Sequence, residues 1–256
     1  MNVAADPRLH AIAKAHPRPL LFATISGAHL YGFPSPDSDY DLRGVHVLPL
    51  REVIGLRRGP ETLERMADEQ GLDLDLVTHD VGKFVRLMAK PNGYVLEQLL
   101  SPLVVVTTPF HAELCELGRR CVTRQHVRHY LGFASSQWQL FAGEDPPRVK
   151  PLLYVYRVLL TGLHLLRTGE LIADLEGLNA AAGLPHVDAL IARKRHGAEQ
   201  GTLDAAELPF HRLQFERLLA ELKQAPASSP LPTSLPHDVA EALHDFLVRV
   251  RLSADR

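Results

Sequence analysis

The sequence predicts an α+β protein in which a small mixed β-sheet is followed by a helical domain. Short apolar runs and period-two alternation, both typical of strands, are confined to roughly the first hundred residues. The rest of the chain carries long stretches in which apolar residues recur at helical spacing. We therefore expect two domains, residues 1–105 around the sheet and residues 106–256 made of helices.

The composition is that of a globular protein. The 256 residues are 46% hydrophobic and 23% charged, which is enough to bury a core. The 28 Lys and Arg are balanced by 30 Asp and Glu, so no overall positive charge holds the chain on a long nucleic acid or an anionic membrane. No uninterrupted apolar run approaches the roughly 18 residues that a membrane-spanning helix needs. We expect a soluble, cytoplasmic protein without a membrane partner.

Three segments are predicted strands. Residues 20–25 form a compact, largely apolar run that ends abruptly at Ser26 and Gly27. Residues 40–47 form a second extended segment, after a loop rich in proline and serine. In residues 72–77 leucines alternate with polar residues, which predicts a strand with one apolar face and one face that bears two carboxylates.

Helical spacing begins after the third predicted strand. Asp80 is expected to cap a helix that Pro91 terminates, and this alternation of strand and helix indicates helices packed on the sheet. Further helices are predicted within residues 110–131, 151–166, 203–222 and 239–250. Residues 225–237, rich in proline and serine, are expected to be an extended connector that holds the last helix at a distance.

Paired carboxylates give the strongest chemical signal in the chain. Asp39 and Asp41 are two residues apart in an extended segment, so their side chains project from the same face. They repel each other unless a cation lies between them, and hard oxygen ligands suit Mg²⁺ or Mn²⁺. Asp73 or Asp75 on a neighbouring strand can supply a third ligand, and the spacing alone does not choose between them. Three carboxylates holding two metal ions are typical of phosphoryl and nucleotidyl transfer.

Four segments in order resemble a known family. They are residues 27–32 (Gly-Ala-His-Leu-Tyr-Gly), 38–44 (Ser-Asp-Tyr-Asp-Leu-Arg-Gly), 75–84 and 92–97, after the apolar strand. This order is similar to that of the DNA polymerase beta-like nucleotidyltransferases, most closely the predicted enzymes of the RNA-ligase-associated polymerase-beta-like group. The resemblance covers residues 20–101, with a weaker match in residues 150–169 and in the last helix.

The resemblance implies a catalytic site and a reaction. Asp39 and Asp41 match the metal-binding pair, and Asp75 matches the third carboxylate, which would also accept the proton of the attacking hydroxyl. The implied fold is a nucleotidyltransferase core with a helical domain that closes the cleft. The implied enzyme uses Mg²⁺ or Mn²⁺ to move a nucleoside monophosphate from a triphosphate, such as ATP, to an acceptor and releases pyrophosphate. The acceptor, whether an RNA end, a small molecule or a protein, is not encoded in these motifs.

One departure from the family pattern lies in the phosphate-binding turn. Gly27 matches the glycine that shapes this turn, but the serine that usually follows it is replaced by Ala28. The hydroxyl contact with phosphate is therefore absent, or is made by Ser26 or a backbone amide. The substitution supports an alternative, a nucleotide-binding or regulatory protein with little turnover. A glycosyltransferase, which also uses Asp-x-Asp, is disfavoured by the glycine turn upstream.

Four further residues have a functional and a structural interpretation. Tyr31 either stacks on a base or packs under the loop. Arg43 clamps phosphate, orients Asp41 or makes a structural ion pair. Asn92 and Glu97 are assigned to the substrate cleft through the resemblance, since their residue types alone indicate only helix surface.

A polar stripe marks the helix predicted in the second half of the chain. Lys150, Tyr154, Arg157, Thr161 and His164 recur at helical spacing on an otherwise apolar helix. We expect such a stripe to face water or a wet cleft. Because the resemblance places a lysine and an arginine here, Lys150, Tyr154 and Arg157 are candidate nucleotide-binding residues, with Lys150 and Arg157 contacting the triphosphate.

Overall fold

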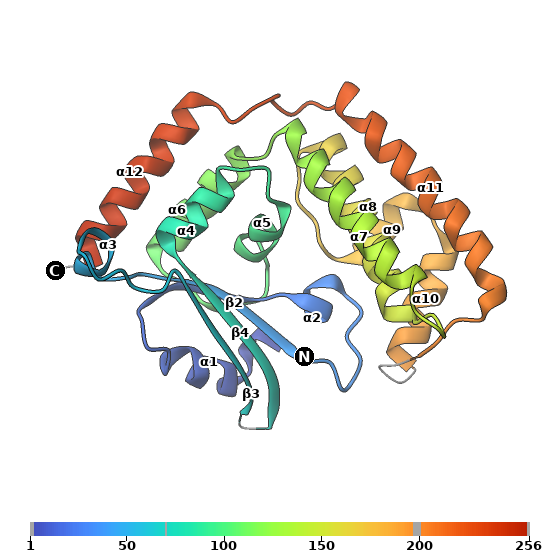
Figure 1. Ribbon diagram of the computed structural model, residues 1–256, viewed down its shortest axis with the longest axis horizontal. Helices are drawn as coiled ribbons and strands as arrows, with labels where there is room; N and C mark the ends of the chain where they lie inside the picture. The colour runs from blue at the N-terminus through green and yellow to red at the C-terminus, as the bar shows by residue number, and fades with distance from the viewer. Residues whose placement is uncertain (1–2, 70, 197–200, 255–256) are drawn as a thin grey trace. The chain divides into compact units, whose positions relative to one another are not determined.

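The computed structural model describes residues 3–69, 71–196 and 201–254, and the chain forms two compact units (Figure 1). Unit 1 comprises residues 1–30, 39–122 and 235–256, and unit 2 comprises residues 31–38 and 123–234. This division differs from the predicted boundary after residue 105. The sheet-bearing unit also takes in the last helix, and residues 31–38 belong to the helical unit.

A five-stranded mixed sheet forms the centre of unit 1. Its strands are β1 (Leu20–Ile25), β2 (Tyr40–His46), β3 (Thr62–Glu69), β4 (Leu72–Asp80) and β5 (Val104–Val106), in the order β3-β4-β2-β1-β5. The β2–β4 pair is parallel, and the pairs β1–β2, β1–β5 and β3–β4 are antiparallel. The predicted fold class, α+β with a small mixed sheet, is confirmed.

Helices cover both faces of this sheet (Figure 1). Helix α1 (Pro7–Lys14) packs Leu9 and Ile12 against one face, where the leucines of β4 are buried. The opposite face carries α4 (Val81–Met88), α5 (Gly93–Leu99) and α6 (Pro109–Arg120). Asp80 caps α4 as predicted, because its side chain accepts a hydrogen bond from the Gly82 N–H. Strand alternation therefore places the odd-numbered side chains of β2 and β4 on the α4–α6 face.

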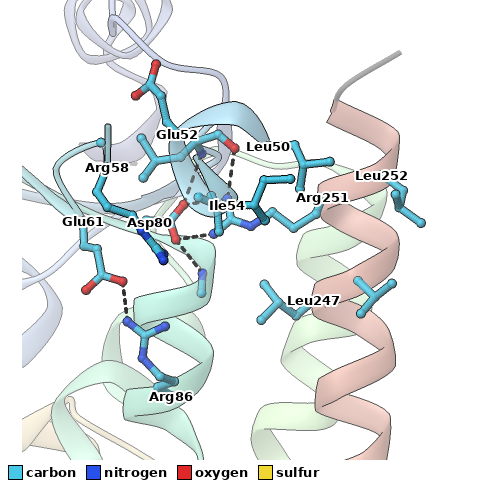
Figure 2. A pocket seen from close by; sticks show the side chains of 15 residues that line it. Leu50, Glu52, Ile54, Arg58, Glu61, Asp80, Arg86, Leu247, Arg251 and Leu252 are labelled. Atoms are coloured by element: carbon cyan, nitrogen blue, oxygen red, sulfur yellow. Dashed lines mark hydrogen bonds and ion pairs between the residues drawn. The ribbon is translucent and has the colours of Figure 1, made fainter. Parts of the chain in front are cut away.

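The last helix, α12 (His237–Ala254), packs on α4 and α6 of unit 1. A buried ion pair holds it there, because Arg251 binds both carboxylate oxygens of Asp80 and also donates to the backbone oxygen of Leu48 at 3.0 Å (Figure 2). The Leu48 and Gly82 N–H groups complete the hydrogen bonds of Asp80 at 3.1 and 2.9 Å. The short helix α3 (Arg51–Ile54) follows Leu48 in the chain.

Helix α8 (Val149–Thr168) is the core of unit 2. Around it pack α7 (Val127–Ala142), α9 (Leu175–Ala182), α10 (Pro185–His196) and α11 (Leu208–Gln224). With 20 residues and a mean hydropathy of 1.2, α8 is long and apolar enough to cross a membrane, but 78% of this window is buried inside the structure, as is typical of a core helix. The remaining helices are α2 (Gly27–Tyr31) and the 3₁₀ turns η1 (Val3–Ala5), η2 (Arg124–His126), η3 (Ala205–Glu207) and η4 (Ala225–Ala227).

Candidate active site

Asp41 and Asp75 lie directly opposite each other on the parallel strands β2 and β4. Both side chains are on the face of the sheet that carries α4–α6. Asp73 shares this face but is exposed, and it precedes the paired stretch, which begins with Tyr40 opposite Leu74. The register therefore brings Asp75, and not Asp73, next to Asp41.

Arg43 joins these two carboxylates. Its Nη2 atom donates to Asp41 Oδ1 at 2.5 Å and to Asp75 Oδ2 at 2.6 Å. Its Nη1 atom donates to the backbone oxygen of Asp75 at 2.5 Å, and Nε donates to the Tyr94 hydroxyl at 3.2 Å. The two carboxylates thus converge on one cationic group. Of the interpretations of Arg43 that the sequence left open, this geometry supports an ion pair that orients Asp41.

The groups around Arg43 keep its guanidinium protonated. Its side chain is 8% exposed, against 17% for Asp41 and 27% for Asp75. Burial by itself lowers the pKa of Arg43, but the Tyr94 hydroxyl and the two carboxylates outweigh burial, and the net pKa lies above its usual value. Arg43 is therefore a permanent cation between Asp41 and Asp75.

Gly27 brings the turn after β1 against the same carboxylate. Its φ of +61° is in the left-handed region that favours glycine. A Cβ atom at this position would lie 1.7 Å from Asp41 Oδ2, which leaves no room for any side chain. The neighbouring Ser26 N–H donates to the Asp41 backbone oxygen at 2.8 Å, and the side chains of Ser26 and Ala28 are buried. The predicted phosphate-binding turn is therefore in direct contact with Asp41.

The other predicted residues of unit 1 are less tightly grouped. Asp39 is half-buried just before β2, and no group of three His, Cys, Asp or Glu side chains placed to hold a metal ion occurs within residues 3–69, 71–196 and 201–254. Asn92 is the N-cap of α5, with a buried Oδ1 atom that has no hydrogen-bond partner among the residues that the structure describes, and Glu97 on α5 is 2% exposed. Tyr94, which contacts Arg43, was missed, because nothing in the sequence separates it from an ordinary helix residue.

The predicted nucleotide-binding residues of α8 lie in unit 2, together with Tyr31. The Arg157 guanidinium lies 4.0 Å from the centroid of the Tyr31 ring, and Tyr154 meets that ring edge-on at 5.5 Å. Arg157 and Thr161 are fully buried, and Lys150 is half-buried. The expectation that this stripe faces water or a wet cleft is therefore not met at its centre, because Arg157 is buried against an aromatic ring. The assignment of Lys150, Tyr154 and Arg157 to nucleotide binding stays a prediction. Tyr31 also packs, as one of its two interpretations proposed.

Residues 31–38, the part of unit 2 that leads to Asp39, are held by contacts with its helices. Lys194 of α10, 1% exposed, donates to Ser35 Oγ at 2.8 Å, and Arg195 donates to the backbone oxygen of Gly32. Gly32 has a φ of +84°, and a Cβ there would lie 1.9 Å from Asp174 Oδ1. The helical unit therefore holds the stretch of chain between the glycine turn and the first carboxylate.

Comparison with known proteins identifies the family. Residues 1–249 match the family described as RlaP, the RNA repair pathway DNA polymerase beta family. The chain belongs to this family. The resemblance to polymerase beta-like nucleotidyltransferases drawn from the sequence motifs is thereby confirmed, and the RlaP match extends it over the helical unit.

Individual relatives of this RlaP-family chain include two proteins whose names state no function. "Uncharacterized protein MJ0002" of Methanocaldococcus jannaschii is 31% identical over 158 residues, 60% of this chain and 63% of that protein, so the match spans less than two thirds of its length. "Uncharacterized protein YcgL" of Bacillus subtilis is 26% identical over 243 residues, 88% of this chain and 90% of that protein. A crystal structure of a nucleotidyltransferase-like protein from Exiguobacterium sibiricum is 13% identical, with a TM-score of 0.33, over 98% of this chain and 80% of that chain.

The contact between Gly27 and Asp41 gives a first prediction for this member of the RlaP family. Gly27→Ala is expected to lower any activity that depends on Asp41 at least about tenfold, because the new Cβ displaces the Asp41 carboxylate, and to destabilise the fold by about 1–2 kcal/mol through the left-handed backbone. Gly183→Ala is the matched control, since Gly183 has a φ of +64° and no atom of a described residue lies within 4 Å of its Cβ position. Melting temperature and turnover are measured for both variants. Equal losses of activity would contradict a role for the contact.

Proposed function

We propose that this chain is a metal-dependent nucleotidyltransferase that moves a nucleoside monophosphate from a nucleoside triphosphate to a hydroxyl group and releases pyrophosphate. The observation that carries the proposal is the convergence of Asp41 Oδ1 and Asp75 Oδ2 on a single point, within 2.6 Å of the same Arg43 nitrogen. An RNA end is the favoured acceptor, since the family is described by an RNA repair pathway. A small molecule or a protein is the other acceptor class.

The two carboxylates fit a divalent cation. Their oxygens already surround a positive charge, they are partly exposed, and carboxylate oxygens are the ligands that Mg²⁺ and Mn²⁺ prefer. Asp41 and Asp75 would hold the metal, with Asp39 as the neighbouring carboxylate on the chain. When bound, such ions neutralise the triphosphate and make the acceptor hydroxyl a better nucleophile.

In the proposed reaction, Asp75, Arg43 and Gly27 have separate roles. The acceptor oxygen forms a bond to the α-phosphorus, and the bond from that phosphorus to the bridging oxygen of the pyrophosphate breaks. Asp75 takes the hydroxyl proton, since its carboxylate is partly exposed beside Asp41. Arg43 holds the Asp41 and Asp75 carboxylates together, and the absence of a side chain at Gly27 leaves room for the Asp41 carboxylate against the turn.

The proposal is tested by following pyrophosphate release with each of the four ribonucleoside triphosphates and an RNA oligonucleotide that carries a free 3′ hydroxyl. We expect release that requires Mg²⁺ or Mn²⁺, stops on addition of EDTA and is lost in Asp39→Ala/Asp41→Ala, with labelled monophosphate recovered on the RNA. Label on a small molecule or a protein instead would keep the reaction and change the acceptor. Failure of the wild-type chain to bind any triphosphate would overturn the proposal.

A second candidate is a nucleotide-binding regulatory protein with little turnover. Ala28 favours it, because a serine hydroxyl is missing at the phosphate-binding turn. In that case the wild-type chain binds a triphosphate in a metal-dependent way but transfers no label to any acceptor. Ala28→Ser distinguishes the two candidates further, since it restores a hydroxyl donor to the turn and is expected to raise turnover only in an enzyme.

A further inference from the structure

A cavity of about 680 Å³ opens on unit 1 between the α3 segment and α12, and neither Asp41 nor Asp75 is among its lining residues (Figure 2). Its side walls are aliphatic, and large parts of them are uncovered: Ile54 is 72% exposed, Leu252 54% and Val248 42%. Leu56, next to this wall along the chain, is fully exposed. We call Ile54, Arg58, Leu247, Val248 and Leu252 the α3–α12 patch. Aliphatic side chains gathered around one hollow are typical of a binding surface.

The α3 wall of the patch is fixed before any partner arrives. Arg18 binds both carboxylate oxygens of Glu52, at 3.1 and 2.8 Å, and the Gly59 N–H closes the loop on the Glu52 backbone oxygen at 3.0 Å. A Cβ on Gly59 would lie 2.4 Å from Glu52 Oε2, so the loop is closely packed on this ion pair. A surface held in one conformation loses little entropy when it binds.

The cavity lining carries Arg58, Arg86 and Arg251 against Glu52, Glu61 and Asp80, and the positive excess arises because Arg18, outside the lining, neutralises Glu52. Each of its three carboxylates is paired: Glu52 with Arg18, Glu61 with Arg86, and Asp80 with Arg251. Arg58 makes no ion pair with any residue that the structure describes, and it lies on the cavity wall (Figure 2). Arg57, the preceding residue, is exposed and also makes no ion pair with any described residue. The patch is therefore aliphatic in its walls and cationic at its edge.

We propose that the α3–α12 patch binds an amphipathic segment of another protein, with aliphatic side chains that enter the cavity and Asp or Glu residues that pair with Arg58 and Arg57. Val248 and Leu252 are one helical turn apart on α12, so their side chains form a row against which a helix of the partner can pack. None of the described residues that line the cavity is aromatic, so they offer single-stranded nucleic acid no stacking platform. The aliphatic side chains line a hollow, which takes the protruding side chains of a peptide segment and does not itself project into a membrane.

The proposal is tested with a displayed library of random peptides selected on the full chain. We expect the enriched peptides to combine aliphatic residues at helical spacing with Asp or Glu, and to bind Arg58→Glu/Val248→Asp about tenfold or more weakly than the wild type. Arg212→Glu is the control, because it reverses an exposed charge on α11 of unit 2. Melting temperatures verify that each variant folds, and Ile54→Ser provides a second, uncharged change to the patch.

Two outcomes would overturn the proposal. The first is enrichment of peptides that bind the double variant as well as they bind the wild type. The second is binding of the wild-type chain, but not of the double variant, to phosphatidylglycerol vesicles without enrichment of any acidic peptide, which would assign the patch to a membrane surface. Because the readout is peptide binding, the result is independent of whether the chain transfers nucleotides.

Discussion

Asp75→Asn is expected to lower kcat/KM for the proposed nucleotidyl transfer on the order of a thousandfold, equivalent to about 4 kcal/mol of transition-state stabilisation. The amide keeps the size of the side chain but removes one of the two negative charges that converge at Arg43. It also removes the proposed acceptor of the hydroxyl proton. Initial rates of pyrophosphate release at saturating Mg²⁺ measure the loss, and circular dichroism verifies that the variant folds.

Asp73→Asn is the matched control for this prediction. Asp73 is two residues away on the same face of β4, carries the same charge and is exposed, but it lies outside the stretch of β4 paired with β2. We expect its rate to stay within about twofold of the wild type, since an exposed charge without a partner contributes little. Comparable losses in the two variants would mean that the negative potential of the sheet face, and not the Asp41–Asp75 pair, supports the reaction.

The sequence predicted the buried strands and missed those at the edges of the sheet. Residues 20–25 and 72–77 were found because one or both faces are buried, which makes their apolar pattern visible. Strand β3 lies at the edge, and its central apolar residue Met66 is 82% exposed, so it carries no alternation to recognise. β5 has three residues, too few for a period. The helix predicted over residues 110–131 is in fact α6 and α7, separated at residues 121–126, where the 3₁₀ turn η2 forms.

The sequence predicts those residues of the candidate site that are identified by residue type and by spacing within one strand. It does not predict those whose position depends on the register between strands or on packing between elements. Asp41 and Asp75 follow from the motifs, but only the β2–β4 register chooses Asp75 over Asp73. Tyr94 contacts Arg43 through the placement of α5, which no local pattern encodes. Arg157 was expected on a wet face, yet it lies over the Tyr31 ring, because a segment more than a hundred positions earlier in the chain packs on α8.

The packing of α12 on unit 1 could not be predicted from the sequence either. Loss of the ion pair that holds α12 there gives the largest expected effect on stability. Arg251→Met is expected to lower the free energy of unfolding by about 3–5 kcal/mol, because it leaves the Asp80 carboxylate buried without its cation. Urea titrations of both proteins measure the difference. Arg249→Met, two residues away on the same helix, breaks an exposed pair with Glu113 and is expected to leave stability unchanged.

The pH dependence separates the ion pair from simple packing. In the wild type, burial alone raises the pKa of the Asp80 carboxyl, but Arg251 and the Leu48 and Gly82 N–H groups outweigh burial and hold it below its usual value. This stability is therefore present above the ordinary carboxyl pKa of about 3.9 and is lost as the pH falls through the lowered value. In Arg251→Met burial acts without the cation, the pKa of Asp80 rises, and stability is expected to fall as the pH increases from about 4 to 7. A variant that is less stable but keeps the wild-type slope would show that Arg251 contributes through packing, and that the ion pair with Asp80 does not hold α12 on the sheet-bearing unit.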